Sequence, residues 1–133
     1  MRSVLVASST PSDAWLAREA LAELGLGHLL VDDAVEAMGE LCRRPTEHSA
    51  VLVGERVGRV SGLTLCGLAR DAGCRLPMLL LTGEDCRWNA VRAARLHVTV
   101  LWRPTSVQRV ARSLLTLLPR RACAMSHPGL ETR

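Results

Sequence analysis

Five short apolar runs recur along the chain, and each one ends at a group of polar or turn-forming residues. The runs are residues 4–7, 28–31, 49–53, 76–81 and 98–102. A continuous apolar run of this length is typical of a strand that is buried on both faces, as in parallel sheets. This pattern favours a sheet that is covered by other elements on both sides.

The segments between the runs have helical periodicity. Pro11 suits the first turn of a helix, with Ser9 or Thr10 as its cap and Asp13 favourable to the helix dipole. We predict helices at residues 11–24, from the pair Asp32 and Asp33 to Pro45, and at residues 63–72, 85–96 and 106–118. Strands that alternate with helices predict a doubly wound α/β fold with a five-stranded parallel sheet and helices on both faces.

The run at residues 76–81 is the most apolar of the five and is expected to form a central strand of the sheet. We expect one domain over residues 1–119 and a flexible tail or linker stub over residues 120–133.

Composition excludes several classes of protein. The chain has 133 residues, enough for one compact domain, and no apolar run approaches the length of a membrane span. Its five cysteines form no CxxC pair and have no histidine at zinc-finger spacing. The four histidines share no common spacing. We therefore expect reduced thiols, a cytoplasmic protein, and neither a metal nor a cofactor.

In a doubly wound sheet the functional site lies beyond the carboxyl ends of the strands. The residues that follow the first, third, fourth and fifth runs are therefore the candidates. These are Ser8 and Ser9, Gly54, Thr82 and Arg103.

Four stretches, at residues 18–25, 35–45, 76–83 and 101–104, resemble the receiver domains of bacterial two-component response regulators. The resemblance to this CheY-like family, whose fold is flavodoxin-like, covers about residues 3–119. It implies two acidic residues after the first strand that hold Mg²⁺, and a phosphoacceptor aspartate after the third. It also implies a threonine or serine after the fourth strand and Lys-Pro after the fifth.

The chain departs from that pattern at three acidic positions. The acidic pair falls on Ser8 and Ser9, and the phosphoacceptor falls on Gly54. Thr82 is retained, and the lysine is replaced by Arg103, which precedes the retained Pro104. Without a nucleophile or carboxylate ligands for Mg²⁺, aspartyl phosphorylation should be absent. We expect no catalytic residue.

Two interpretations of the remaining residues stay open. Thr82 and Arg103 either preserve a switch, in which they bind an anion, or keep a closed pocket in which Arg103 bonds strand-end carbonyls. The second is favoured. Glu55 is the only nearby acid, and the alternation of side chains along a strand predicts that it points to the opposite face.

Residues 8–12 also suggest an alternative function. A hydroxyl-rich loop before a helix can cradle a phosphate, so a flavodoxin-like ligand-binding domain or enzyme is the main alternative. Helix capping explains the same residues and is favoured. A receiver with an unorthodox phosphoacceptor is the other alternative.

The arginines are unevenly distributed. Residues 86–121 contain eight arginines and no aspartate or glutamate. A docking surface for an acidic protein is one interpretation, and a solvated surface without a partner is the other. Nucleic acid is a weaker candidate, and a homodimer through a symmetric all-arginine face would repel itself. The expected face consists of Arg87, Arg92, Arg95, Trp102, Arg109 and Arg112.

The sequence therefore predicts a receiver-like signalling domain that is not phosphorylated and not an enzyme. It would act by protein–protein contact in a bacterial two-component or transcription-control pathway.

Overall fold

The computed structural model describes residues 3–83 and 87–118. The strands of the main sheet are β1 (Ser3–Ala7), β2 (His28–Val31), β3 (His48–Val53), β6 (Met78–Thr82) and β7 (Val98–Trp102). The helices are α1 (Pro11–Glu23), α2 (Ala34–Arg43), α3 (Gly62–Asp71), α4 (Arg87–Arg95) and α5 (Val107–Leu117), with a 3₁₀ turn at Pro45–Glu47. The predicted tail and the predicted start of the fourth helix at Asp85 lie outside the described residues.

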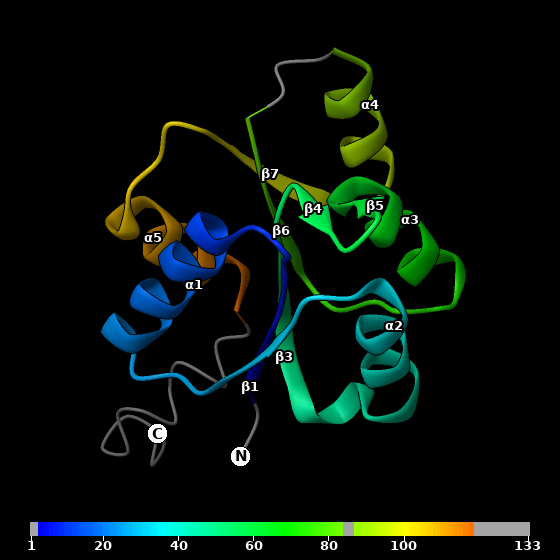
Figure 1. Cartoon of the computed structure of the whole chain (residues 1–133), viewed down its shortest axis with the longest axis horizontal. Coiled ribbons are helices and arrows are strands. Elements are labelled where there is room, and N and C mark those ends of the chain that lie inside the picture. The colour runs from blue at the N-terminus through cyan, green and yellow to red at the C-terminus, as the bar shows by residue number, and fades with distance from the viewer. Residues whose placement is uncertain (1–2, 84–86, 119–133) are drawn as a thin grey trace, which may run out of the picture.

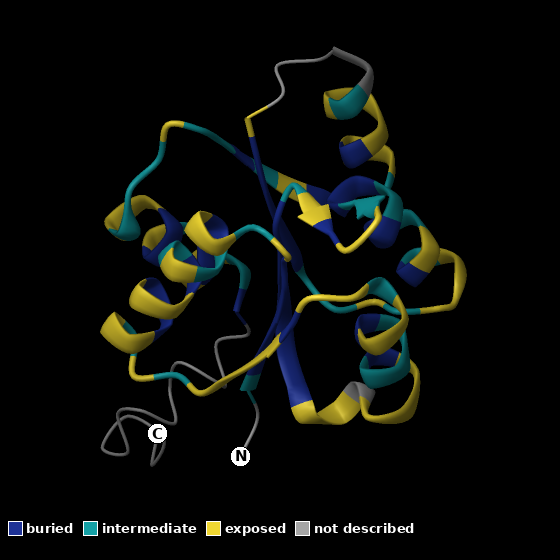
Figure 2. Cartoon of the chain, in the orientation of Figure 1, coloured by how far each residue is buried: buried dark blue, intermediate teal, exposed yellow. Residues whose placement is uncertain are grey.

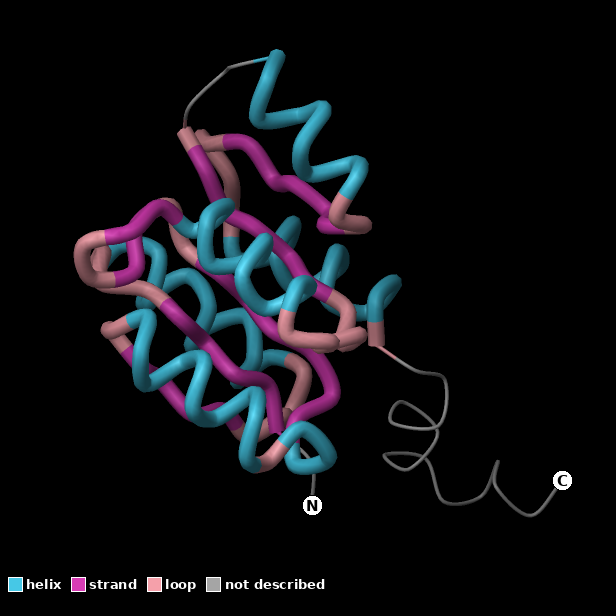
Figure 3. Tube along the Cα trace, turned by 90° about the vertical axis from the view of Figure 1, so that its right-hand side faces the viewer, coloured by secondary structure: helices cyan, strands magenta, loops and turns pink. Residues whose placement is uncertain are grey.

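The five strands form one parallel sheet in the order β2-β1-β3-β6-β7. Helices α1 and α5 cover one face, and α2, α3 and α4 cover the other (Figures 1 and 3). The predicted doubly wound α/β fold is confirmed. The central strand is β3, whereas the apolar run expected there forms β6, the neighbouring strand.

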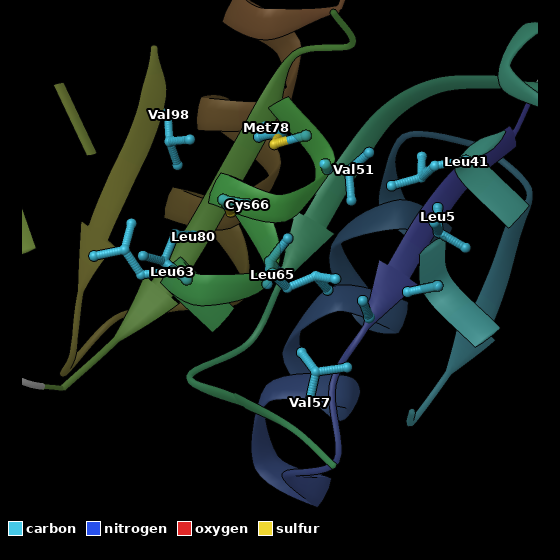
Figure 4. Packing of buried hydrophobic residues seen from close by; sticks show 14 of the residues in the cluster. Leu5, Leu41, Val51, Val57, Leu63, Leu65, Cys66, Met78, Leu80 and Val98 are labelled. Carbon is cyan, nitrogen blue, oxygen red and sulfur yellow. The ribbon is translucent and has the colours of Figure 1, made fainter. Parts of the chain in front are cut away.

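Each face of the sheet has its own hydrophobic core. On the α2–α3–α4 side, Leu5, Val51 and Leu80 from the strands pack with Leu65 and Cys66 from α3 (Figure 4). On the other side, residues of β1, β3 and β6 pack against α1 and α5. Figure 2 shows the result as buried strands between helices whose outer surfaces are exposed. Burial on both faces explains why the strands are continuous apolar runs instead of alternating ones.

Three apolar residues of α2 and α3 are on the surface of the domain. Val35 is 79% exposed, Leu68 is 47% exposed, and Cys42 is also exposed. Small residues allow close approach of the helices to the sheet, and in α2 and α3 the buried positions include Ala37 and Ala69. Val35, Cys42 and Leu68 lie outside the buried stripe of their helices.

The predicted loop between the third strand and the third helix contains a small antiparallel hairpin. Its strands are β4 (Arg56–Val57) and β5 (Val60–Ser61), and Gly58 between them has φ +64°. The left-handed conformation favours glycine at this turn. Val57 is buried, so the hairpin is anchored to the core beside the carboxyl end of β3.

Two polar side chains tie elements together at the other end of the sheet. Buried His48 lies 3.1 Å from Glu40 Oε1 through Nε2 and 3.2 Å from Ser3 Oγ through Nδ1. Arg70 donates hydrogen bonds to the carbonyl oxygens of Leu96 and Leu76, each at 2.8 Å. These contacts connect α2 to the sheet and α3 to the loops that enter β6 and β7. They do not reach the carboxyl ends of the strands.

None of the helices in the described part of the chain has the length and apolar character that a membrane crossing would need.

Candidate functional site at the carboxyl ends of the strands

The candidate residues follow strands that are neighbours in the sheet. Gly54 follows β3, and its N–H donates to the carbonyl oxygen of Ala7 at the end of β1 (2.9 Å). Arg103 follows β7, and its N–H donates to the carbonyl oxygen of Thr82 (2.9 Å). Parallel strands bring their carboxyl ends to one edge, so residues from four distant parts of the sequence meet here.

Ser8 and Ser9 use their hydroxyl groups in local structure. Ser8 Oγ accepts a hydrogen bond from Thr10 N–H at 3.1 Å, and Ser9 Oγ donates to the carbonyl oxygen of Arg56 at 3.1 Å. Thr10 is the N-cap residue of α1, which confirms one of the two predicted cap residues, but its side chain makes no capping hydrogen bond. Ser8 instead closes a short turn before the helix.

Gly54 stands where any side chain would collide. A Cβ at this position would overlap Ser8 Oγ, would lie 2.8 Å from Ser8 Cβ and would lie 3.0 Å from Asp13 Oδ2. Gly62 is equally constrained, because its Cβ would overlap the carbonyl oxygen of Gly54. Close packing between these segments therefore requires glycine at both positions.

Asp13 belongs to the site, although the sequence suggested only a role at the helix dipole. It lies in the first turn of α1 and is fully buried. Its Oδ1 accepts a hydrogen bond from Arg103 Nη1 at 2.9 Å, and its Oδ2 accepts one from Glu55 N–H at 3.2 Å. One signal in the sequence pointed here: Asp13 lies four and seven residues before the buried Ala17 and Ala20, on the inward stripe of the helix.

Glu55 also faces into the site, so the prediction that it points to the opposite face is wrong. Its Oε1 accepts hydrogen bonds from Gly83 N–H (2.6 Å), from Thr82 Oγ1 (3.3 Å) and from Arg103 Nη2. Alternation along a strand does not apply, because β3 ends at Val53 and Glu55 lies in the turn that leads to the hairpin.

Arg103 bridges the two carboxylates. One guanidinium nitrogen pairs with Asp13 and another with Glu55, and its side chain is 27% exposed. The side chain of Arg103 was expected to bond strand-end carbonyl oxygens, and its described partners are carboxylate oxygens instead. A planar guanidinium suits this double contact because its donors diverge in a fixed fork.

The two carboxylates differ in their pKa directions. Burial raises the pKa of Asp13, and this effect outweighs the lowering by the Glu55 N–H and by Arg103. The pKa of Glu55 is lowered, first by the hydrogen bond from Gly83 N–H and then by Arg103 and Thr82. Glu55 is therefore held as a carboxylate by the donors around it.

The donor set does not fit the Mg²⁺ ion that the resemblance implies. The hydroxyl groups of Ser8 and Ser9 already form hydrogen bonds with backbone groups of Thr10 and Arg56, and Gly54 provides no side chain. Both nearby carboxylates are bound to the positive charge of Arg103. Mg²⁺ needs a nearly octahedral set of oxygen ligands, usually including unpaired carboxylates, and a neighbouring guanidinium would repel it. Among the described residues, no cluster of three or more metal-ligating side chains occurs.

The residues of the expected arginine face lie on two helices that cover opposite faces of the sheet beside β7 (Figure 1). Arg92 and Arg95 are on α4, and Arg109 and Arg112 are on α5. All four are exposed, and none forms an ion pair with another described residue. Trp102 is the last residue of β7 and is half-buried, and in the sequence it lies between the arginines of α4 and those of α5. The side chain of Arg87 is not among the described side chains.

Comparison with solved structures identifies the fold. The receiver domain of the Francisella response regulator 1452 matches with a TM-score of 0.75 at 17% identity, covering 88% of this chain and 96% of that one. The chemotaxis protein CheY4 of Vibrio cholerae matches with a TM-score of 0.74 at 17% identity, covering 89% and 99%. This chain has the receiver-domain fold. No protein-family model and no curated protein matches the sequence.

A third receiver domain gives a useful contrast. The receiver domain of the sensor histidine kinase PA1611 from Pseudomonas aeruginosa matches with a TM-score of 0.72 at 19% identity, covering 87% of this chain and 96% of that one. That structure has a magnesium ion coordinated in its active-site cleft. In this chain the carboxyl ends of the strands carry the Asp13–Arg103–Glu55 cluster.

Proposed function

We propose that this chain is a signalling domain of the receiver fold that works by protein–protein contact and is not phosphorylated. It would act in the cytoplasm, in a two-component or transcription-control pathway of a bacterium, and not as an enzyme. The observation that carries the proposal is Gly54. The resemblance to receiver domains assigns this residue to the phosphoacceptor position, where glycine offers no nucleophile and where a Cβ would overlap Ser8 Oγ.

The surroundings of Gly54 support the same conclusion. Phosphoryl transfer to a carboxylate requires a free nucleophile and a divalent cation that neutralises the developing charge. The two carboxylates near Gly54 are instead paired with Arg103. Neither chemical requirement is met by these residues.

The first experiment tests phosphorylation directly. The protein is treated with Mg²⁺ and acetyl phosphate, and intact mass is measured before and after. We expect no addition of a phosphoryl group. Labelling that disappears in Glu55→Gln would overturn the proposal and favour Glu55 as an unorthodox acceptor.

The interaction surface is proposed to be the exposed arginines of α4 and α5. Unpaired guanidinium groups retain their capacity for bidentate contacts with carboxylates, and a partner with an acidic surface would be attracted to them. Trp102 lies between the two arginine pairs in the sequence and lines a cavity together with Arg92, and aromatic residues of this kind are enriched at protein interfaces.

A charge-reversal pair of variants tests this surface. Arg92, Arg95 and Arg109 are replaced together by glutamate in one variant, and the exposed Arg18, Arg43 and Arg75 in the other. Both variants change net charge equally. We expect only the first to lose a protein partner that wild type captures in nuclease-treated extract, and added salt to weaken the wild-type complex. Equal loss in both variants would contradict a specific surface.

A further inference from the structure

The end of the sheet contains a set of donors that converge on a single oxygen atom. Thr82 Oγ1, Gly83 N–H and Arg103 Nη2 all donate to Glu55 Oε1. A hydroxyl, a backbone amide and a guanidinium that meet at one point form a binding site for an oxyanion. In this chain the occupant is the carboxylate of Glu55.

We infer that Glu55 is the built-in ligand of this anion site and that it keeps free oxyanions such as inorganic phosphate out. The inference rests on the proposed function, because it names what fills the site in place of a transferred phosphoryl group. The chemical class that the donors would accept, once Glu55 is removed, is a small tetrahedral oxyanion.

The geometry gives three reasons. First, the donors come from separate elements, the end of β6, the residue after it and the residue after β7, so the sheet holds them in place independently of Glu55. Second, Arg103 is also fixed by Asp13 at 2.9 Å, so its guanidinium keeps an anchor when Glu55 is absent. Third, the local backbone of Glu55 is fixed by its N–H bond to Asp13, which aims its side chain at the donors.

The site can be reached from solvent. The side chain of Glu55 is 28% exposed, and a cavity of about 100 Å³ is bounded by Glu55, Thr82, Asn89, Arg92 and Trp102. Arg92 adds a second positive charge beside this opening. An anion of the size of phosphate therefore has a route to the donors once the carboxylate is removed.

The test compares Glu55→Ala with Glu19→Ala, an exposed residue of α1 whose loss changes the net charge equally. Each protein is titrated with sodium phosphate against sodium chloride at equal ionic strength, and the melting temperature is recorded. We expect a saturable rise only in Glu55→Ala, roughly 3–6 °C when phosphate exceeds its Kd tenfold. Replacing Arg103 by glutamine in the Glu55→Ala background should abolish the rise.

The amide of Gly83 gives a readout at the site itself. In Glu55→Ala the chemical shift of this amide should change with phosphate concentration, and the change should saturate over the same concentrations as the rise in melting temperature. If wild type binds phosphate as well as Glu55→Ala does, the inference is wrong. It is also wrong if folded Glu55→Ala shows no binding, or shows binding that leaves Gly83 unperturbed.

A second measurement applies if Glu55→Ala does not fold. In wild type, the Gly83 amide resonance should titrate with Glu55 at acidic pH, and the titration should be absent in Glu55→Gln. A Gly83 resonance that is unaffected by pH would overturn the inference. Phosphorylation of wild type would overturn the proposed function instead, so the two failures are distinguishable.

Discussion

The guanidinium of Arg103 lies 2.9 Å from the carboxylate of Asp13, although the two residues are 90 positions apart in the sequence. Asp13 lies in the first turn of α1, and Arg103 follows the last strand of the sheet. The contact joins α1 to the segment between β7 and α5 at a position where Asp13 is fully buried. A buried carboxylate needs a partner, so this pair should matter to stability as well as to the site.

Replacing Asp13 by alanine should lower the free energy of unfolding by about 3 kcal/mol, because the change leaves Arg103 without one of its two anions. Asp13→Asn should cost less, about 1 kcal/mol, because the amide oxygen can still accept a hydrogen bond from Arg103 or from the N–H of Glu55. Urea denaturation measures both, with Glu19→Ala as a near-neutral control on the same helix. Equal losses for alanine and asparagine would contradict this explanation.

The contribution of Glu55 to the free energy of unfolding should decrease as pH falls. Its pKa is lowered in the folded protein, so the folded state favours the carboxylate over the acid. The stabilisation is therefore fully present above the ordinary pKa of 4.5 and is lost as pH falls through the folded value. The stability difference between wild type and Glu55→Gln should shrink below that pH.

Asp13 acts in the opposite direction in the same experiment. Because its pKa is raised above 3.8, the cost of its buried charge is relieved as pH falls through the folded value. Both proteins contain Asp13. Subtracting the pH-dependent free energy of unfolding of Glu55→Gln from that of wild type therefore removes most of the contribution of Asp13. A difference that grew on acidification would contradict the ion pair between Glu55 and Arg103.

Gly54→Ala should destabilise the domain by about 1–3 kcal/mol through overpacking, because its Cβ would overlap Ser8. Gly27→Ala is the matched control, since the nearest atom to a Cβ there is Ser3 Cβ at 4.0 Å. In a Ser8→Gly background the alanine at position 54 should cost less, with a coupling energy of about 1 kcal/mol. Additive effects in urea denaturation would show that the overlap with Ser8 is not the cause.

The cysteines should differ in their reaction with iodoacetamide. Burial raises the pKa of Cys66 to about 12, whereas Cys42 is exposed. The thiolate is the reactive form, so peptide mapping after alkylation at pH 8 should find Cys42 modified and Cys66 protected. Both should react in denaturant. Rapid alkylation of Cys66 in the folded protein would contradict its burial.

The sequence was sufficient to predict the fold class because that prediction depends on local patterns. Buried parallel strands must be apolar along their whole length, and residues 49–53 and 98–102 carry that pattern without reference to any other part of the chain. The rule that sites lie beyond the carboxyl ends of strands then led to Gly54, Thr82 and Arg103.

The orientation of Glu55 and the burial of Asp13 were decided by the tertiary structure. Glu55 lies beyond the last residue of β3, where no periodic rule predicts the direction of a side chain, and the donors of Thr82, Gly83 and Arg103 determine where its carboxylate is stable. Asp13 satisfied the local rule for an acidic residue at a helix N-terminus, and only its spacing to Ala17 and Ala20 placed it on the inward stripe of α1. It is buried because α1 packs against the sheet with Arg103 opposite it, and no local pattern contains the position of a charge that is 90 residues away.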